Sequence, residues 1–590
     1  MRLLLFALLL TAVTYGQTNS YTISFENATH HEAHITASFP GIKTNTVTVR
    51  MPRTSPGRYA IHEFAKNVYD LKATNIKGEI LKTSRPDPYS WEISGHDGTV
   101  NVTYTLFADR ADGTYSQIDE THAHLNMPAT FMFMENTEER PIEVTFKIRE
   151  DLNWKVATQL KKLSDTTYYA PNLQYFMDSP TEISDYKLRE YKVDEQNIRF
   201  VLHSPDTAND FDTYWKNVQG VVEQEKAVFG ELPTFDYGEY TFLACYLPHV
   251  SGDGMEHRNS TILTDRETLA DGGMQGNIGT VSHEFFHAWN VERIRPDDLE
   301  PFDFTAANMS GSLWFAEGFT SYYTNLILAR AGIITPEDYV KGLNRTFNYV
   351  WNSPARAYFN PIEMSYQAPF VDAATSVDPV NRGNTFISYY SYGSVLGLAL
   401  DLELRANELN LDDFFKRVWK KYGKTEVAYT IENLEGVLGE YAGAAFAKAY
   451  FSKYIYNSEM PDYEQLFKQV GLTITQDSKK PFTGMTTEKS SKGISIARTV
   501  NQGTPAYLAG LEKGDLILKV NDKNIEEAED FNEVIAASKV GEILSIAYER
   551  FGETKTATMT LVSDPTYLIE MNTNVKSKVE KARDAWLGKQ

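Results

Sequence analysis

The sequence is poor in the residues that build disulfide-rich folds and histidine-rich metal sites. It has one cysteine, Cys245, in 590 residues, so no disulfide can form within the chain. It has 12 histidines, and none of them follows His287. After the first residues, no apolar run approaches the roughly 18 residues of a membrane-spanning helix. These shortages exclude a disulfide scaffold, a membrane span in the mature chain, and any metal motif whose third histidine lies downstream of His287.

Positive charge is also scarce relative to negative charge. The chain has 57 Lys and Arg against 79 Asp and Glu, a formal net charge of −22. A global negative charge argues against nucleic acid or an anionic membrane surface as a partner. Hydrophobic residues make up 42% and aromatic residues 13% of the sequence, which is enough to build large cores. We therefore expect a folded, multidomain protein.

The first residues are typical of an export signal. Arg2 precedes an apolar run of about eleven residues, Leu3 to Val13, which is the length of a secretory signal core and too short to cross a bilayer. Small residues follow, and Gly16 favours cleavage before Gln17. We predict a signal peptide over residues 1–16. Export without disulfides is typical of a bacterial periplasmic or secreted protein.

Hydrophobic periodicity changes along the chain and predicts a multidomain α+β protein. Residues 17–190 alternate apolar and polar positions in short segments, which predicts a β-rich domain. Residues 191–471 are mainly helical, and residues 472–564 are a small β-rich module with one longer helix. Residues 565–590 form a charged C-terminal tail. Cys245 lies in an apolar run of the second region, where we expect a buried thiol on a strand.

A short motif in the helical region carries the clearest chemistry. His283 and His287 are four positions apart, so on a helix both imidazoles lie on one face and reach a single metal ion. Glu284 follows the first histidine and is placed to take a proton from a metal-bound water. Cap-type residues before the motif and Pro296 after it predict a helix that runs to Ile294. The motif predicts a hydrolytic site with one zinc ion per chain.

A catalytic zinc needs a third protein ligand, and it must be a carboxylate here because no histidine remains downstream. Glu317 lies in the stretch LWFAEGFTSYY on a second predicted helix, roughly 312–331. Asp297 and Asp298 are rivals, but they lie beside Pro296 in a predicted loop. We favour Glu317, since apolar and aromatic neighbours surround it on most sides.

These segments together resemble the glycyl aminopeptidase family of gluzincin zinc metallopeptidases. The resemblance rests on HEFFHAWNVERIRP (283–296), LWFAEGFTSYY (313–323), an early SPGRY (55–59) and a PDZ-like segment at 505–521. It implies an N-terminal β-rich domain, a thermolysin-like, mainly helical zinc peptidase domain and a C-terminal PDZ domain. The PDZ-like module would bind a peptide C-terminus or an added strand.

The resemblance also implies two further site residues. The segment that contains Glu256 resembles the Gly-x-Met-Glu-Asn loop of aminopeptidases, whose glutamate holds the free α-amine of the substrate; His257 replaces the Asn. Tyr390 resembles the tyrosine of a Tyr-x-Lys-Gly segment that donates to the developing oxyanion. Tyr392 stands where relatives have Lys, and the adjacent Tyr389 is a rival for the same role.

Three functions compete at this point. The resemblance implies a zinc aminopeptidase that removes small N-terminal residues such as Gly or Ala from peptides. A zinc endopeptidase or oligopeptidase would use the same metal site on internal bonds. A non-enzymatic peptide-binding protein would use the PDZ-like module alone, although the complete ligand set and Glu284 speak against it.

Overall fold

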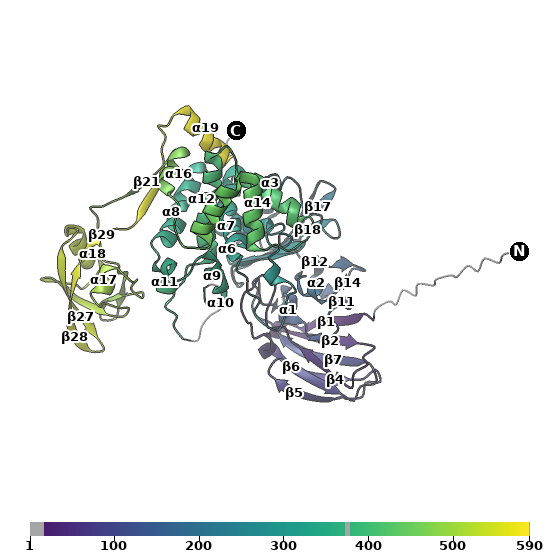
Figure 1. The fold of residues 1–590 in the computed structure, drawn as a ribbon. Helices are drawn as coiled ribbons and strands as arrows, with labels where there is room; N and C mark the ends of the chain where they lie inside the picture. Colours follow the sequence, from purple (N-terminus) through teal and green to yellow (C-terminus); the bar gives the residue numbers. More distant parts are fainter. Residues whose placement is uncertain (1–16, 372–377, 589–590) are drawn as a thin grey trace.

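The structure is a computed structural model that describes residues 17–371 and 378–588. The predicted signal peptide, residues 1–16, lies outside the described residues, and export stays a prediction. Among the described residues, no helix has both the length and the hydropathy needed to cross a membrane. Figure 1 shows three regions: an N-terminal β region in purple and blue, a central helical region, and a C-terminal β region in yellow and green. The predicted multidomain α+β class is confirmed.

The N-terminal region contains two sheets that pack into one core. Alternating buried and half-buried residues along β7 show why these segments form strands with one face in the core. Tyr21, Tyr104 and Phe131 are among the side chains that fill this core. The seven-stranded sheet has the order β13 (Lys161–Lys162), β14 (Thr167–Ala170), β11 (Ile142–Lys147), β1 (Asn19–Asn27), β2 (Glu32–Phe39), β7 (Val100–Phe107) and β4 (Val68–Thr74). The second has the order β10 (Phe133–Met134), β3 (Thr46–Arg50), β6 (Ser90–Ser94) and β5 (Lys82–Asp87).

A third sheet of the N-terminal region lies against the central region. Its order is β12 (Lys155–Thr158), β15 (Thr181–Ser184), β9 (His122–Leu125) and β8 (Gln117–Ile118). Every residue of β9 and β15 is buried. Ala157 of this sheet packs with Val201 and Leu243 of the central sheet in one apolar cluster. The third sheet of the N-terminal region and the sheet of the central region therefore pack against each other.

The central region begins with a five-stranded sheet. Its order is β16 (Lys187–Val193), β17 (Gln196–His203), β18 (Glu239–Tyr246), β20 (Ser260–Asp265) and β19 (Asp253–His257). Strands β17, β18 and β20 are parallel, and β19 is an antiparallel edge strand. The residues Gly254 to His257, which the sequence places in a loop, thus belong to a strand. Pairing of Met255 with Ile262 fixes their register, which no local pattern in the sequence predicts.

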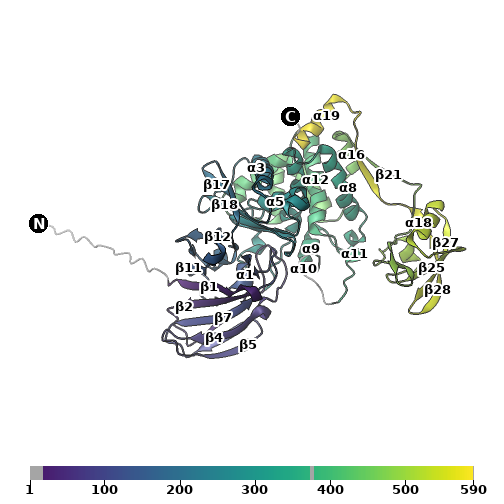
Figure 2. The same ribbon diagram turned by 180° about the vertical axis from the view of Figure 1, so that it is seen from behind.

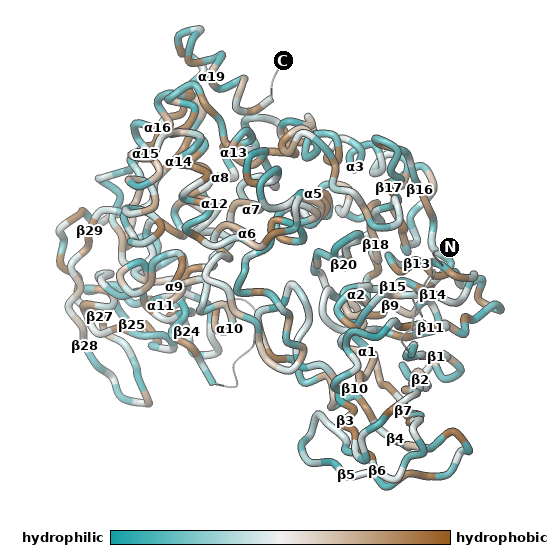
Figure 3. Tube along the Cα trace, turned by 45° about the vertical axis from the view of Figure 1, so that its right-hand side comes forward, coloured by the Kyte–Doolittle hydropathy of each residue, from teal (hydrophilic) through white to brown (hydrophobic). Residues whose placement is uncertain are grey.

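Helices pack on this sheet and form the largest core of the molecule. Figure 2 shows α3 and α5 beside the sheet strands β17 and β18, and Figure 3 marks hydrophobic stretches within the same packed region. Phe285, Trp289 and Phe415 are among the buried residues of this core. The main helices are α3 (Ala208–Phe229), α5 (Ile278–Phe286), α6 (Leu313–Ala316), α7 (Gly318–Arg330), α8 (Pro336–Trp351), α12 (Tyr389–Ala406), α13 (Leu411–Val418), α14 (Ile431–Ala442), α15 (Ala444–Tyr450) and α16 (Tyr463–Gln469).

The C-terminal β region has its own core and is reached through paired strands. Ile494, Ile517 and Phe531 pack in this core. Its sheet has the order β23 (Thr487–Ser490), β24 (Gly493–Ile496), β25 (Leu516–Val520), β27 (Ile543–Arg550) and β28 (Glu553–Thr560), with helices α17 (Pro505–Leu508) and α18 (Ala528–Ala537). The chain leaves the central region along β21 (Leu472–Gln476) and returns along β30 (Tyr567–Met571), which pair antiparallel.

The charged C-terminal segment packs on the central region. Helix α19 (Ser577–Leu587) places Trp586 in the main core, where its side chain is fully buried. The indole Nε1 donates to the hydroxyl of Tyr322 on α7 at 2.9 Å. The last helix is therefore part of the packed central region, which its charge pattern alone does not indicate (Figure 1).

Candidate active site

Helix α5 carries the histidine pair. Ile278, Val281 and Phe285 are buried and fix one face of this helix in the core. The opposite side presents His283 and His287, whose Nε2 atoms lie 3.1 Å apart. Both imidazoles therefore point to the same place, as the spacing predicts.

The helix ends earlier than the sequence indicates. It ends at Phe286, with His287 as its C-cap, whereas the sequence predicts a helix that continues to Ile294. Beyond Phe286, two main-chain carbonyls accept hydrogen bonds from side chains. The Arg293 guanidinium donates to Ala288 O at 2.9 Å, and His287 Nδ1 donates to Asn290 O at 2.6 Å. The prediction was wrong because regular i→i−4 bonding is interrupted after the second histidine, where Glu292 N donates to His287 O five residues back and nearby side chains bond main-chain carbonyls.

Glu317 joins the histidines at the junction of α6 and α7. Its Oε2 lies 3.5 Å from His283 Nε2 and 3.2 Å from His287 Nε2. The rivals Asp297 and Asp298 lie in a short 3₁₀ turn, and Asp298 accepts a hydrogen bond from Gly311 N instead. Among the described residues, the donor group at this point is His283, His287 and Glu317.

The donor set fits a tetrahedral zinc ion. Atoms held about 2.1 Å from zinc in a tetrahedron lie about 3.4 Å from one another, close to the three separations given above. His287 Nδ1 donates to a carbonyl, and His283 Nδ1 donates to Thr324 Oγ1 at 3.2 Å, because that hydroxyl already donates to Thr320 O. Each imidazole therefore presents its Nε2 lone pair to the common point.

Electrostatics at this point also favour a cation. Burial lowers the pKa of His287, but Glu317 and Glu256 outweigh it and raise that pKa to about 10. Burial raises the pKa of Glu284 well above its usual range; His287 opposes this, and Glu256 adds to it. Burial likewise raises the pKa of Glu256. Three buried carboxylates around two imidazoles thus stabilise positive charge, which a metal ion supplies.

Two glycines set the distance between α7 and α12. A Cβ on Gly318 would lie 2.4 Å from the Cα of Gly393, and a Cβ on Gly393 would lie 1.9 Å from Trp314 O. The helices can cross at this distance only without side chains. The crossing brings Tyr390, at the start of α12, beside the site, with ring centroids of Tyr390 and His283 5.8 Å apart.

Tyr392 and the rival Tyr389 are placed differently from Tyr390. Tyr392 is fully buried in the core. Tyr389 is also buried, and its ring packs edge-on against Tyr59 with centroids 6.2 Å apart. Tyr390 is thus the tyrosine of this segment that contacts the first histidine of the pair.

Strand β19 carries two further features of the site. Gly254 faces Glu284: a Cβ at Gly254 would lie 2.2 Å from Glu284 Oε1, so this glycine makes the space that the carboxylate occupies. Two residues on, Glu256 is 5% exposed, and ligand atoms of Glu256, Glu284 and His287 all lie within 4.8 Å of one another. Within the described part of the chain, Glu256 Oε1 makes no hydrogen bond although it is buried. An unpaired buried carboxylate oxygen is costly and favours a cationic ligand.

A loop of the N-terminal region completes the site, and sequence reasoning assigned no role to it. Tyr59 donates from its hydroxyl to Glu317 Oε1 at 2.8 Å, and its side chain is buried. Gly57 packs on β19: a Cβ there would lie 2.9 Å from Glu256 Oε2. Arg58 forms an ion pair with Asp253, the first residue of β19. The SPGRY segment was the only sequence signal for these contacts, which join residues far apart in the chain.

Asn290 is a second residue that sequence reasoning missed. Its side-chain amide donates to Phe315 O and Ala316 O, each at 3.2 Å, just before Glu317. Its carbonyl accepts the hydrogen bond from His287 Nδ1. One residue therefore ties the second histidine to the segment that carries the third ligand.

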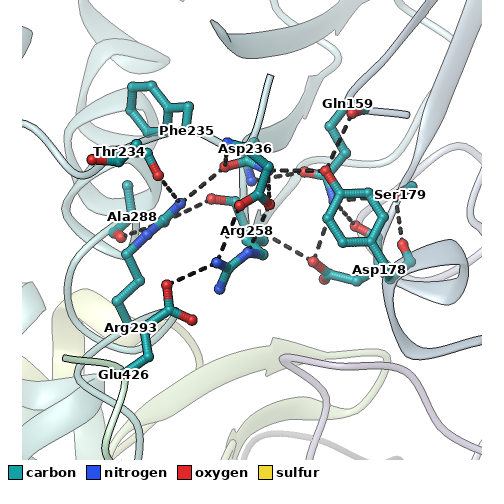
Figure 4. Close-up of polar contacts among 12 residues, drawn as sticks. Gln159, Asp178, Ser179, Thr234, Phe235, Asp236, Arg258, Ala288, Arg293 and Glu426 are labelled. Atoms are coloured by element: carbon teal, nitrogen blue, oxygen red, sulfur yellow. Dashed lines mark hydrogen bonds and ion pairs between the residues drawn. The ribbon is translucent and has the colours of Figure 1, made fainter. Parts of the chain in front are cut away.

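His257, which replaces the Asn of the aminopeptidase loop, faces away into a polar network. Its Nδ1 lies 2.9 Å from Asp178 Oδ1 of the N-terminal region. Figure 4 shows this neighbourhood, in which Arg258 bonds Asp236 and Glu426 while Arg293 bonds main-chain carbonyls. His257 therefore contacts Asp178 of the N-terminal region, and the carboxylate of Glu256 stays in the site.

Comparisons with known proteins agree with this geometry. The M61 peptidase N-terminal domain matches residues 20–185, the M61 glycyl aminopeptidase domain matches residues 276–396, and a PDZ domain matches residues 481–561. The solved structure of an aminopeptidase N family protein from Idiomarina loihiensis has a TM-score of 0.82 and 22% identity, with 97% of this chain and 100% of that chain covered. This likeness shows a shared fold.

A more distant match is a mutant M1 zinc metallopeptidase from Deinococcus radiodurans bound to a Tyr-Ser-Ala substrate. Its TM-score is 0.44 with 12% identity, and 76% of this chain and 95% of that chain are covered. No curated protein matches the chain.

The fold and the site define a metallopeptidase, and the chain is one. It resembles the M61 glycyl aminopeptidase family, whose N-terminal and peptidase domain models match the chain in order, followed by a PDZ domain model. The resemblance inferred from the sequence is confirmed.

Proposed function

We propose that the chain is a zinc aminopeptidase that removes small N-terminal residues, such as Gly or Ala, from peptides. The observation that carries this proposal is the position of Glu256, a buried carboxylate with an unpaired oxygen beside the donor atoms of Glu284 and His287. A carboxylate there pairs with a free α-ammonium and places the first peptide bond at the metal site.

Zinc is the metal that suits the donor set best. Two imidazole nitrogens and one carboxylate oxygen, with a fourth position left for water, are the ligands of many catalytic zinc sites. His283, His287 and Glu317 would hold one ion per chain. When bound, zinc lowers the pKa of its water toward about 7 and polarises the scissile carbonyl.

Glu284 would carry out the proton transfers, and Tyr390 would stabilise the negative charge that develops on the carbonyl oxygen. Glu284 accepts a proton from the attacking water and passes it to the leaving amine, as a general base and then a general acid. Tyr390 donates its hydroxyl hydrogen bond to the developing oxyanion. Tyr59 and Asn290 contact ligand residues and not the substrate, so they act as positioning residues.

Close packing near Glu256 supports a preference for a small N-terminal residue. Gly57 packs directly on Met255 and Glu256, and Ser55 and Tyr59 of the same loop are buried. This loop closes the cleft on the side of the α-amine. A separate pocket between α7, α8 and α12 is lined by His283, Tyr390 and Val395, and neither the loop nor β19 contributes to it. We infer that the remainder of the peptide lies on that open side.

The PDZ domain offers a second place for a peptide. Strand β23 lies at one edge of its sheet, beside β24, and an edge strand can pair with an added peptide strand. We propose this as a contact for longer substrates or for a peptide C-terminus, separate from the catalytic cleft.

Substrates with a blocked N-terminal amine distinguish an aminopeptidase from an endopeptidase. We expect the purified chain to hydrolyse Gly- and Ala-p-nitroanilide and a free Ala-Ala-Ala peptide, but not the N-acetylated forms of the same compounds. We expect Glu256→Gln to lower kcat/KM for the free forms by about 10- to 100-fold, the equivalent of one charge-assisted hydrogen bond of about 1.5–3 kcal/mol. Equal cleavage of free and acetylated peptides, unaffected by Glu256→Gln, would establish an endopeptidase instead.

A further inference from the structure

A second group of metal-type ligands lies where the N-terminal and central regions meet. His122 on β9 and Glu182 on β15 come from the third sheet of the N-terminal region. His203 and Cys245 come from β17 and β18 of the central sheet, where they are paired neighbours. All four residues are buried, and one ligand atom of each lies within 4.8 Å of all the others.

The separations of the ligand atoms are those of a tetrahedral site. His122 Nδ1 lies 3.0 Å from His203 Nδ1 and 3.4 Å from Cys245 Sγ. His203 Nδ1 lies 3.9 Å from Cys245 Sγ and 3.4 Å from Glu182 Oε1, and His122 Nδ1 lies 3.7 Å from Glu182 Oε1. Nitrogen or oxygen at about 2.1 Å and sulfur at about 2.3 Å from a tetrahedral ion are separated by about 3.4–3.6 Å.

The surroundings direct lone pairs to the centre of this group. His122 Nε2 lies 3.7 Å from Asp119 and His203 Nε2 lies 3.9 Å from Asp185. Both separations exceed hydrogen-bond length, but a negative charge on this side of an imidazole favours its proton at Nε2 and leaves Nδ1 to bind a metal. His124 contacts the other oxygen of Glu182, Oε2, at 3.3 Å.

Without an ion, this arrangement is unfavourable. In the described part of the chain, Glu182 Oε1 makes no hydrogen bond although the residue is 1% exposed. The imidazole His122 is fully buried, so solvent does not separate it from Glu182 and Cys245. A buried carboxylate oxygen without a well-placed donor costs free energy, and a cation at the centre would offset that cost; the nearest imidazole nitrogen, His203 Nδ1, lies 3.4 Å away.

We propose that His122, Glu182, His203 and Cys245 bind a second, structural zinc ion. Two nitrogens, one sulfur and one oxygen match the ligand preferences of zinc. One carboxylate and one thiolate balance the two charges of the ion, which suits a buried site. Four protein ligands complete the tetrahedron, so this ion has no position for a substrate. A surface pocket that His203 lines with Asp185 and Leu247 gives the ion a route from solvent.

The site would fix the two regions relative to each other. Each region supplies two of the four ligands, and the ion therefore joins their sheets directly. Tyr59 of the N-terminal loop meets Glu317 across the same pair of regions. Because the unfolded chain lacks the site, bound zinc stabilises the folded state and its interdomain arrangement.

Cobalt(II) substitution tests the proposal, because Cys245 is the only cysteine of the chain. We expect the full chain, depleted of zinc and reloaded with cobalt, to show a near-ultraviolet thiolate-to-cobalt charge-transfer band. Cys245→Ser should abolish this band, and Glu317→Ala, which alters only the catalytic ligand set, should keep it at full intensity. No band in the native chain would overturn the proposal.

Zinc content and X-ray absorption give a readout that does not depend on folding of a cysteine variant. We expect two zinc ions per native chain and one in Glu317→Ala, whose zinc edge should show one sulfur neighbour at about 2.3 Å. A remaining zinc without sulfur, or no zinc in Glu317→Ala, would show that the group is a metal-free polar contact. A purified chain with copper at the thiolate would overturn the assignment to zinc.

Discussion

Two buried groups of ligands in this molecule differ in number, origin and surroundings. His283 lies on α5, His287 at its C-cap and Glu317 between α6 and α7, and among the described residues these three form the ligand group. The interdomain group has four ligands, all on strands. Catalytic zinc keeps an open position for water, whereas structural zinc fills its four positions with protein. From the number of ligands, we therefore assign catalysis to the three-ligand group and structural stabilisation to the four-ligand group.

The surroundings of the two groups sharpen this division. Beside the three-ligand group lie Glu284, Glu256 and Tyr390, which add two carboxyl groups and a phenol to its three ligands. Beside the four-ligand group lie carboxylates that orient the imidazoles, Asp119 and Asp185. Carboxyl groups and a phenol beside the metal ligands are suited to proton transfer and to stabilising the charge of the transition state.

We expect the largest effect from a substitution of Glu284, the carboxylate on α5 beside the metal ligands. Glu284→Gln keeps the size of the side chain but cannot accept the proton of the attacking water. We expect kcat for Ala-p-nitroanilide to fall by about 10²- to 10⁴-fold, while zinc per chain stays at the native value. Loss of zinc together with activity would instead make Glu284 part of metal binding and would weaken the distinction between the two groups.

The phenol beside His283 should have the next largest effect. Tyr390→Phe removes one hydrogen bond to the developing oxyanion, and we expect kcat to fall by about 10²- to 10³-fold, or about 2.7–4 kcal/mol, with little change in KM. Tyr389→Phe is the matched control on the adjacent position and should have a much smaller effect. An equal loss in both variants would mean that the tyrosines support packing only.

A smaller effect is expected from the N-terminal loop. Tyr59→Phe removes the hydrogen bond to Glu317 Oε1, and we expect zinc affinity at the catalytic group to fall by about 10- to 100-fold. The measurement is a chelator competition followed by activity, with added zinc restoring the native kcat. Failure of zinc to restore activity would show that Tyr59 acts on the substrate or the fold.

The sequence predicted the catalytic group better than any other part of the molecule. His283, Glu284 and His287 are local in sequence, and helical geometry converts their spacing directly into proximity. Glu317 followed by elimination, because no histidine remained. The length of helix α5 was overestimated, since the side-chain bonds to the carbonyls of Ala288 and Asn290, although local, follow no capping or hydrophobic pattern in the sequence.

Contacts between regions could not be predicted in the same way. Tyr59 meets Glu317 across 258 positions, and Cys245 meets His122 across 123 positions. Each of these residues, taken alone, is an ordinary strand or loop residue, and we interpreted Cys245 only as a buried thiol. Trp586 joins the main core for the same reason, because long-range packing outweighs the charge of the C-terminal segment.

Zinc content and turnover of Glu317→Ala, measured beside the native chain, test the central claim most directly. We expect the variant to hold one zinc fewer per chain than the native protein and to lose hydrolysis of Ala-p-nitroanilide. Native zinc content with native turnover in this variant would contradict the assignment of His283, His287 and Glu317 as the catalytic metal site.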